Sequence, residues 1–133
     1  MPIERLNPPG LHPTPGYHHV TVVPAGRTAH LAGQCPLDAE GRLVGEGDLA
    51  RQVDQVVANT LAALAAVGAS PGDVVRTQIL VASDGRDDLA ATWTQLRASP
   101  LADAFTTAST LVGVARLGYP GQLVELDVTA ALD

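Results

Sequence analysis

Two carboxylates in one apolar segment are the residues of this chain whose type and spacing best suit chemistry. Glu125 and Asp127 lie in the segment LVELDV, and residues two apart on a strand project from the same face. A carboxylate within hydrogen-bond reach of a water molecule can act as a general acid or base in hydrolysis. A glutamate that alternates with Leu and Val is more often exposed to solvent, so the pattern alone leaves both interpretations open.

Histidine and cysteine offer no comparable site. His18 and His19 are adjacent, so on a strand their side chains point to opposite faces, and no cluster of carboxylates lies beside them or beside His30. Cys35 is the only cysteine, which excludes an internal disulfide and zinc sites built from several thiolates. No basic neighbour in sequence would lower its pKa, so we interpret Cys35 as a small buried residue rather than a nucleophile. We predict no metal and no cofactor.

The charge of the chain argues against a nucleic-acid partner. Acidic residues outnumber basic ones by 14 to 8, the formal net charge is −6, and arginine supplies every basic side chain. The sequence therefore has no basic stripe that could neutralise phosphate groups. The single cysteine fits a reducing compartment, and the Pro-rich start contains no apolar stretch long enough for a signal peptide or a membrane span. We expect a cytoplasmic protein without a membrane partner.

Two helices and several short strands are predicted to position these residues. Apolar side chains between residues 48 and 67 recur at the spacing of one helix face, and Gly68 is a typical helix stop. The four prolines and two glycines of residues 8–16 predict a loop. We predict a second helix near residues 88–98 and strands at residues 3–6, 18–23, 27–33, 73–82, 107–117 and 123–131.

This order of elements predicts a single α+β domain over residues 1–133, with both helices on one face of a mixed sheet. The segments 18–23 and 27–33 flank the tripeptide PAG, which has the composition of a hairpin turn, so we expect these two strands to pair antiparallel. The other face of the sheet must also be covered, because several strands are apolar throughout, as at Val112 and Val114. No residues remain for a second helical layer, so we expect a partner subunit there.

The segment from His30 to Val81 carries a pattern that resembles a known family. It contains the elements GQ-x-P-x-D-x-x-G-x-L-V and Q-x-x-x-x-x-x-N-x-x-x-x-L-x-x-x-G-A-S-x-x-D-V-V, which resemble the central signature of the YjgF/RidA family of reactive enamine and imine deaminases, also described as endoribonuclease L-PSP. The matching residues are Gly33, Gln34, Pro36, Asp38, Gly41, Gln52, Asn59, Gly68, Asp73 and Val74. The resemblance implies a chorismate-mutase-like fold and a homotrimer with small-molecule clefts at the subunit boundaries.

The resemblance also implies which residues line the clefts. Tyr17 in GYHHV matches the family's tyrosine, and Gly33 would present its backbone groups to a ligand. Glu125 matches the glutamate of the family's V-E-I-E element, which orients or activates the water that hydrolyses the imine. Trp93 falls near the position of a small amide in the family's second helix, where it would place a bulky ring.

The chain departs from the family pattern where the carboxylate of the ligand is bound. In TTASTLVGVARL the family arginine falls on Ser109, and Leu111 replaces a residue that is often small or carries a thiol. A guanidinium grips a carboxylate through two charge-assisted hydrogen bonds, which a serine hydroxyl cannot do. Arg116 is an odd number of residues from Ser109, so a regular strand would place the two on opposite faces. The resemblance therefore implies an arginine-lacking branch with a more apolar cleft.

Three functions remain open on the sequence alone. The first is hydrolytic deamination of an enamine or imine that lacks the usual carboxylate anchor, with Glu125 as the catalytic residue. Its predicted substrate-binding residues are Tyr17, Gly33, Trp93, Ser109 and Leu111. The second is a non-catalytic, ligand-binding or chaperone-like trimer, which the losses of a serine at Ala32 and an arginine at Ser109 favour. The third is a ribonuclease activity, against which the acidic charge and the scarcity of aromatic residues argue.

Overall fold

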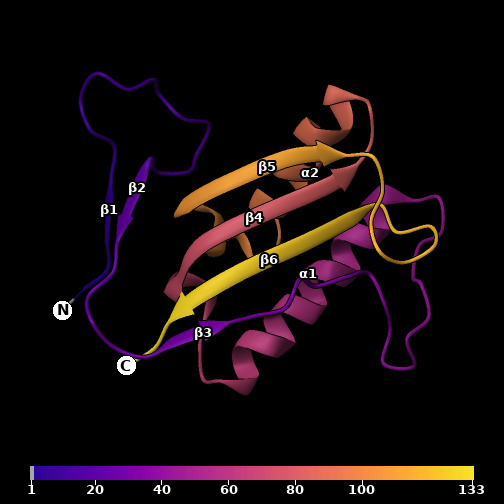
Figure 1. Ribbon diagram of the computed structural model, residues 1–133, viewed down its shortest axis with the longest axis horizontal. Coiled ribbons are helices and arrows are strands. Elements are labelled where there is room, and N and C mark those ends of the chain that lie inside the picture. The colour runs from indigo at the N-terminus through magenta and orange to yellow at the C-terminus, as the bar shows by residue number, and fades with distance from the viewer. Residues whose placement is uncertain (1) are drawn as a thin grey trace.

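Four strands form one mixed sheet, and two helices pack on one of its faces (Figure 1). The computed structural model describes residues 2–133. The strand order is β3-β6-β4-β5, and β1 and β2 form a separate two-stranded ribbon. The strands are β1 (Glu4–Leu6), β2 (Val20–Val22), β3 (Thr28–His30), β4 (Val74–Ala82), β5 (Ala108–Val114) and β6 (Val124–Ala131), and the helices are α1 (Leu49–Ala66) and α2 (Arg86–Arg97). The predicted α+β class with a mixed sheet is confirmed.

Helix α1 forms where the apolar spacing predicts it. It begins after Asp48, whose side chain accepts a hydrogen bond from the backbone N–H of Arg51, the usual role of an N-cap aspartate. Its apolar face packs against the sheet. The helix ends before Gly68, which adopts a left-handed φ of 73° that favours glycine. No helix within residues 2–133 combines the length and the apolar composition that crossing a membrane requires.

The register of the strands determines which side chains face the helices. Along β4, Thr77 and Ile79 are buried against the helices, and Gln78 between them points the other way. Strand β5 runs parallel to β4, with Ser109 paired to Thr77 and Leu111 paired to Ile79. Ser109 and Leu111 therefore project toward the helices.

The opposite face of the sheet, which we call the open face, is turned toward the viewer in Figure 1. Strand β6 runs antiparallel to β4, and Glu125 pairs with Leu80, which points away from the helices. Glu125 and Asp127 therefore lie on the open face, while their neighbours in β6 are buried in the core. The open face is formed by Arg76, Gln78, Leu80, Thr110, Val112, Val114, Glu125, Asp127 and Thr129.

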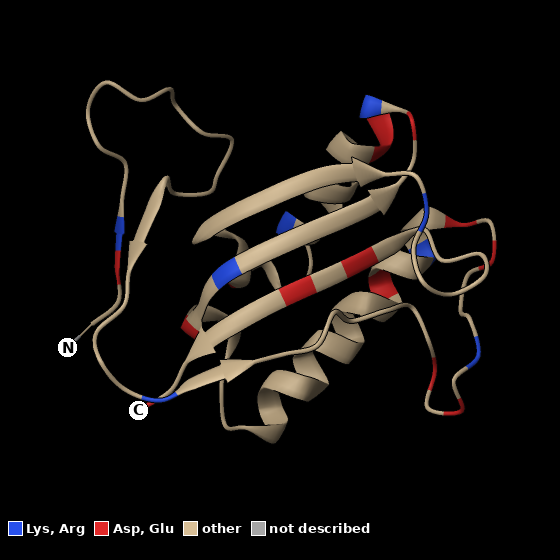
Figure 2. Cartoon of the chain, in the orientation of Figure 1, with Lys and Arg blue, Asp and Glu red and all other residues tan. Residues whose placement is uncertain are grey.

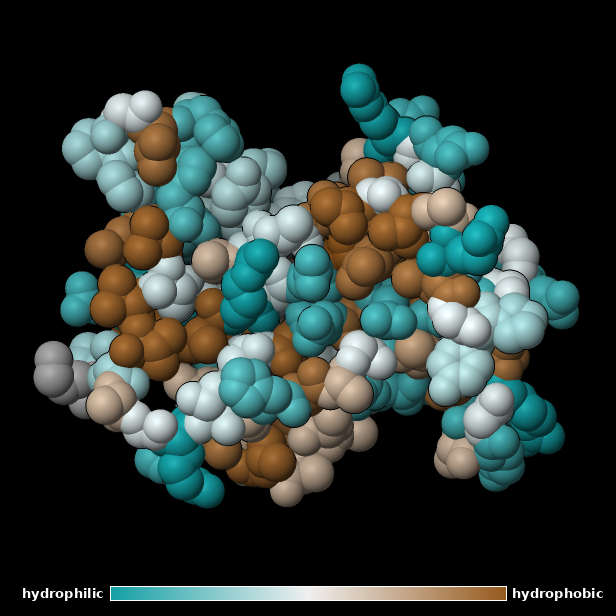
Figure 3. All heavy atoms as spheres, in the orientation of Figure 1, coloured by the Kyte–Doolittle hydropathy of each residue, from teal (hydrophilic) through white to brown (hydrophobic). Residues whose placement is uncertain are grey.

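Charge and apolar surface are separated on the open face. Glu125 and Asp127 give β6 two acidic positions and Arg76 gives β4 a basic one (Figure 2). Val112 and Val114 lie toward the carboxyl end of β5, where Figure 3 shows hydrophobic residues gathered over the ends of β4 and β5. This part of the surface suits contact with another protein chain better than contact with water.

The predicted antiparallel hairpin of residues 18–23 and 27–33 is wrong. Strand β2 pairs instead with β1, with Val20 opposite Leu6, and β3 pairs with β6. The physical reason is burial: in β3, Ala29 lies opposite the buried Ala130 of β6 and extends the core, which pairing with β2 would not do. The PAG tripeptide marks a change of chain direction, but it does not determine the strand with which the next segment pairs. The leading strand predicted at residues 3–6 is confirmed as β1.

The β1–β2 ribbon is attached to the sheet at the start of β4 and β5. The hydroxyl of Thr21 accepts a hydrogen bond from the backbone N–H of Ala108 at 3.0 Å and lies 2.6 Å from the hydroxyl of Thr107. Arg5 donates to the carbonyls of Gly72 and Val74 at 2.9 and 3.0 Å. The outer side of the ribbon leaves three large apolar side chains exposed, namely those of Leu6, Val20 and Val22.

Candidate functional site

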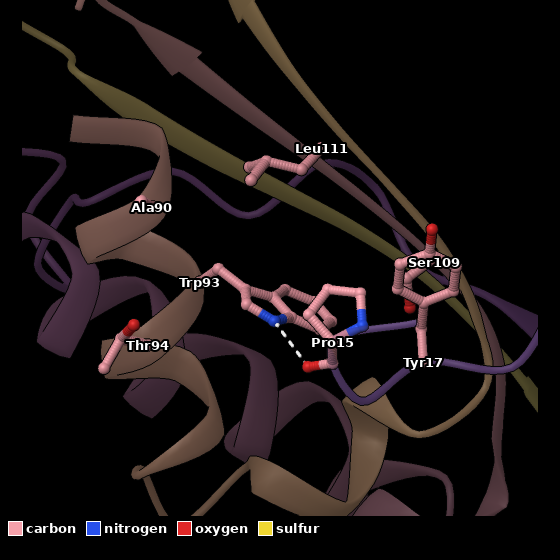
Figure 4. A pocket seen from close by; sticks show the side chains of 7 residues that line it. All are labelled: Pro15, Tyr17, Ala90, Trp93, Thr94, Ser109 and Leu111. Carbon is pink, nitrogen blue, oxygen red and sulfur yellow. Dashed lines mark hydrogen bonds between the residues drawn. The ribbon is translucent and has the colours of Figure 1, made fainter. Parts of the chain in front are cut away.

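The six predicted site residues lie in two groups on opposite faces of the sheet. Four of them surround a cavity on the helix side, between β5 and α2 (Figure 4). The other two, Gly33 and Glu125, meet at the open face. Within one chain, the sheet stands between the cavity and the Glu125 carboxylate.

The cavity between β5 and α2 has a volume of about 330 Å³ and almost entirely apolar walls. Trp93 projects from α2, Leu111 and Ser109 come from β5, and Tyr17 comes from the loop before β2 (Figure 4). The lining residues are Pro15, Tyr17, Ala90, Trp93, Thr94, Ser109 and Leu111. None of these residues carries a charged side chain, so the cavity offers no direct counter-ion to a charged ligand.

Aromatic rings join the cavity wall to the core. The Trp93 ring packs edge-to-face with Tyr17 at 6.2 Å and with Phe105 at 5.9 Å between ring centroids, distances at which such pairs are favourable. The indole N–H of Trp93 donates to the carbonyl of Pro15 at 3.2 Å, and Arg97 donates to the same carbonyl at 2.8 Å. The Pro-rich loop is therefore held across the mouth of the cavity by α2.

The hydroxyl of Ser109 is engaged within the sheet. It accepts a hydrogen bond from the hydroxyl of Thr77 at 2.5 Å and donates to the carbonyl of Thr107 at 3.0 Å. A hydroxyl has one proton, so Ser109 has none left for a ligand. Arg116 does not line this cavity but lies in a separate hollow, beside Tyr119 and the loop that leads to β6.

Tyr17 has a partner that sequence reasoning missed. Its hydroxyl lies 3.2 Å from Nε2 of His12. The His12 ring packs edge-on against His19, and Nε2 of His19 donates to the His12 carbonyl at 2.8 Å. No sequence signal indicates this contact, because His12 and Tyr17 lie in an irregular Pro-rich loop whose path follows no repeating spacing.

Glu125 is held by donors from two different segments. Its Oε1 accepts a hydrogen bond from Nε2 of Gln122 at 3.3 Å and from the thiol of Cys35 at 3.4 Å. The carboxylate lies over the Cα of Gly33, where a Cβ would clash with Oε2. Gly33 therefore admits the carboxylate because it has no side chain.

The Glu125 carboxylate in turn affects the Cys35 thiol. Burial raises the pKa of Cys35, and the hydrogen bond to Glu125 and the charge of that carboxylate raise this pKa further, while a hydrogen bond from Gln122 lowers it. The thiol is protonated at neutral pH and is a poor nucleophile. Cys35 is only partly buried, so the predicted full burial is wrong.

Two polar residues of the signature in α1 hold the segments on either side of Glu125. The buried Gln52 donates to the carbonyls of Gly45 and Gly121 and accepts from the N–H of Leu123, all within 3.0 Å. Asn59 donates to the carbonyls of Cys35 and Leu37 at 2.9 Å. These contacts give Gln52 and Asn59 a structural role in placing Gln122, Cys35 and Glu125.

The histidines take part in local contacts rather than in a cluster. His18 contacts the carbonyl of Thr106 through Nδ1, and His19 is bound to the backbone of the Pro-rich loop. Among residues 2–133, His, Cys, Asp and Glu side chains do not gather in a group of three or more that could hold a metal ion.

The chain is similar to solved proteins over nearly its whole length. The family model described as Endoribonuclease L-PSP matches residues 10–132. A Yersinia pestis protein of unknown function, from the conserved Rid protein family, is 37% identical with a TM-score of 0.90, covering 99% of this chain and 100% of that chain. A member of the YjgF protein family from Neisseria meningitidis is 25% identical with a TM-score of 0.64, covering 98% and 95%. Yeast Mmf1, at 20% identity and a TM-score of 0.70 over 99% and 100%, shares the fold.

A shorter similarity relates the chain to the protein DfrA of Myxococcus xanthus. The two are 36% identical over 69 residues, which are 52% of this chain and 53% of DfrA. The match therefore spans about half of each protein.

Proposed function

This chain belongs to the endoribonuclease L-PSP family, which takes in the YjgF and Rid proteins, and we propose that it hydrolytically deaminates a small, apolar enamine or imine without a carboxylate. The observation that carries this proposal is the uncharged cavity between β5 and α2. Ser109 lies in this cavity at the position where the family pattern has an arginine. Its hydroxyl donates its proton to the backbone carbonyl of Thr107. Recognition in this cavity therefore depends on apolar and aromatic surface.

The walls of the cavity favour a neutral ligand. A carboxylate bound beside Ser109 would lose two charge-assisted hydrogen bonds of about 1.5–3 kcal/mol each, or roughly 10²–10⁴ in affinity. An apolar ligand instead gains about 25 cal/mol for each Å² that it buries against Trp93 and Leu111. The cavity volume of about 330 Å³ suits a ligand with a single ring.

Glu125 supplies the proton transfer in this proposal. An enamine first takes a proton at carbon and loses one from nitrogen, which gives the imine. Water then adds through its oxygen to the C=N carbon, and the Glu125 carboxylate accepts a proton from that water. The imine nitrogen takes a proton from solvent, which gives a carbinolamine with a hydroxyl and an amino group. Glu125 then returns its proton to the amino nitrogen, the hydroxyl gives its proton to solvent, the C–N bond breaks, and a ketone and ammonia leave. Solvent gives one proton and receives one, so atoms and charge balance over the cycle.

We place the complete site between two subunits of a homotrimer. Glu125 lies on the open face and the cavity lies behind the sheet, so a single chain cannot bring them together. A neighbouring subunit that packs against the open face would present its own cavity to this carboxylate. The apolar surface around Val112 and Val114 and the exposed apolar side chains of the β1–β2 ribbon support such packing.

A non-catalytic, ligand-binding trimer is the second candidate function. The observation that favours it is the Ser109 hydroxyl, which is bound within the sheet and offers a ligand no proton. Ribonuclease activity is less well supported, because a chain with a net charge of −6 and no lysine lacks a basic groove for a polynucleotide.

A matched pair of ketones tests the binding part of the proposal. Cyclohexyl methyl ketone carries a methyl group where cyclohexylglyoxylate carries a carboxylate. Both resemble products of imine hydrolysis. Trp93 is the only tryptophan and lines the cavity, so its fluorescence reports occupancy. We expect the neutral ketone to bind at least about tenfold more tightly than the keto acid. Tighter binding of the keto acid would contradict the proposal.

A cavity-filled variant and an ammonia assay complete the test. Ala90 lines the cavity from α2, so Ala90→Phe should abolish the fluorescence response while leaving Trp93 in place. The N-unsubstituted imine of cyclohexyl methyl ketone should release ammonia faster than its spontaneous hydrolysis with wild-type protein and at the spontaneous rate with Ala90→Phe. Ketone binding without accelerated ammonia release would favour the ligand-binding function instead.

A further inference from the structure

The two oxygens of Glu125 have different surroundings, and we infer that Gln122 and Cys35 are positioning residues that hold Oε1 and leave Oε2 to accept the proton from water. This inference rests on the proposed role of Glu125 in hydrolysis. Both donors reach the same oxygen, Gln122 at 3.3 Å and Cys35 at 3.4 Å. Oε2 is the oxygen that lies over Gly33.

Gln122 is fixed by contacts on both sides of its amide. The residue is only 4% exposed. Its Oε1 accepts from the backbone N–H of Tyr119 at 3.1 Å, and its Nε2 donates to the carbonyl of Val124 at 3.0 Å. These two contacts determine which end of the amide carries the nitrogen. The second N–H of Nε2 is then directed at Glu125.

Cys35 is fixed through its backbone. Asn59 of α1 binds the Cys35 carbonyl at 2.9 Å, which holds this residue beside β6. The neighbouring bridge between Gln34 and Leu126 completes the attachment, with N···O distances of 2.6 and 3.0 Å. A protonated thiol donates to a carboxylate, so Cys35 acts here through its hydrogen rather than as a nucleophile.

Saturating one oxygen restricts the carboxylate to one useful orientation. With two donors on Oε1, turning the carboxylate away would break the hydrogen bond from Gln122 and leave the Cys35 thiol only the carbonyl of Gly33, at 3.6 Å. Oε2, which lies over Gly33, accepts no hydrogen bond from the side chains and backbone of residues 2–133, so it is the oxygen left to bind a water molecule. A general base is effective only when its reacting atom is held within hydrogen-bond reach of the proton that it takes.

The contact itself can be tested without any substrate, so this test stands even if the proposed hydrolysis fails. In nitrogen–proton correlation spectra, the side-chain amide protons of Gln122 should differ between the wild-type protein and Glu125→Gln, because the variant replaces their charged acceptor with a neutral amide. The buried Gln52 is the internal control, because its amide donates to backbone carbonyls. Gln122 signals that are the same in both proteins would overturn the contact.

The positioning role is tested by kinetics with the imine of cyclohexyl methyl ketone. Gln122→Met should lower kcat about tenfold and leave KM unchanged, because the cavity that binds the ligand is not altered. In the Glu125→Gln background the same change should have no further effect, since Gln122 acts through Glu125. Gln95→Met is the control, because the Gln95 amide donates to the carbonyl of Ala50 and to Asp54 rather than to Glu125, and any effect of this change on kcat should be the same in both backgrounds. A wild-type kcat for Gln122→Met, or an additive loss in the double variant, would overturn the inference.

Discussion

Ser109 lines the cavity, but its hydroxyl makes contacts within the sheet. Its hydroxyl is the acceptor for the hydroxyl of Thr77, a fully buried residue. A buried hydroxyl without a partner costs about 1–3 kcal/mol. This explains why the serine is tied to the sheet rather than to a ligand.

Ser109→Ala should therefore reduce the free energy of unfolding by about 1–3 kcal/mol. The double variant Ser109→Ala with Thr77→Val removes both hydroxyls and should recover most of that loss. Denaturant unfolding of the two single variants and the double variant measures the coupling. Losses that simply add would show that the two hydroxyls do not depend on each other.

Cys35 gives a pH-dependent prediction about Glu125. Burial and the Glu125 carboxylate both raise the pKa of the thiol, so Glu125→Gln lowers this pKa and increases the thiolate fraction at any pH below it. Alkylation of Cys35, the only cysteine, by iodoacetamide at about pH 8 should become faster. As a control, Cys35 should be alkylated at the same rate in the wild-type protein and in Glu125→Gln once both are unfolded in denaturant. An unchanged or slower rate in the folded variant would contradict the contact.

The sequence allowed the grouping of the cavity residues to be predicted only in part. The resemblance to the family named Tyr17, Trp93, Ser109 and Leu111, and the structure places all four around one cavity. The position of Glu125 on the other face could not be predicted, because it depends on the register between strands that are distant in sequence. Gln122 gave no signal, since its role arises from a turn and not from a repeating pattern.

At the scale of elements, local sequence patterns predicted a helix with one buried face, but they did not predict which strands pair across long distances in the sequence. The apolar spacing and Gly68 defined α1 closely. The hairpin predicted across the PAG tripeptide did not form, because β3 pairs with β6, where Ala29 packs against the core. The chain between β1 and β2 forms the Pro-rich loop, and the carbonyl of Pro15 in this loop accepts a hydrogen bond from Trp93 in the cavity wall.

Thr21 is the residue through which the β1–β2 ribbon holds the start of β5. Its hydroxyl binds the N–H of Ala108 and the hydroxyl of Thr107. Thr21→Val keeps the shape but removes both contacts, and should lower the free energy of unfolding by about 1–2 kcal/mol. Thr28→Val in β3 is a control at a residue that is exposed in the isolated chain. If the two variants unfold alike, the ribbon is not anchored at Thr21.

At the scale of the whole molecule, the open face and the β1–β2 ribbon predict self-association. Three subunits of 13.7 kDa should scatter light as one particle of about three times that mass. Replacing Val112 with Asp places a charge within the apolar part of the open face and should shift the particle toward monomer. A wild-type protein that remains a monomer at micromolar concentration would rule out the shared site.

The most direct measurement of the shared site mixes two variants that are defective for different reasons. Glu125→Gln keeps an intact cavity but should lower kcat about 100-fold or more, whereas Ala90→Phe keeps the carboxylate but fills the cavity. In randomly mixed trimers, about one quarter of the sites join an intact cavity to an intact Glu125 from the neighbour. The randomly mixed sample, parental homotrimers included, should therefore release ammonia from the imine of cyclohexyl methyl ketone at about a quarter of the wild-type rate. Mixed trimers as inactive as their parents would show that Glu125 does not serve a neighbour's cavity.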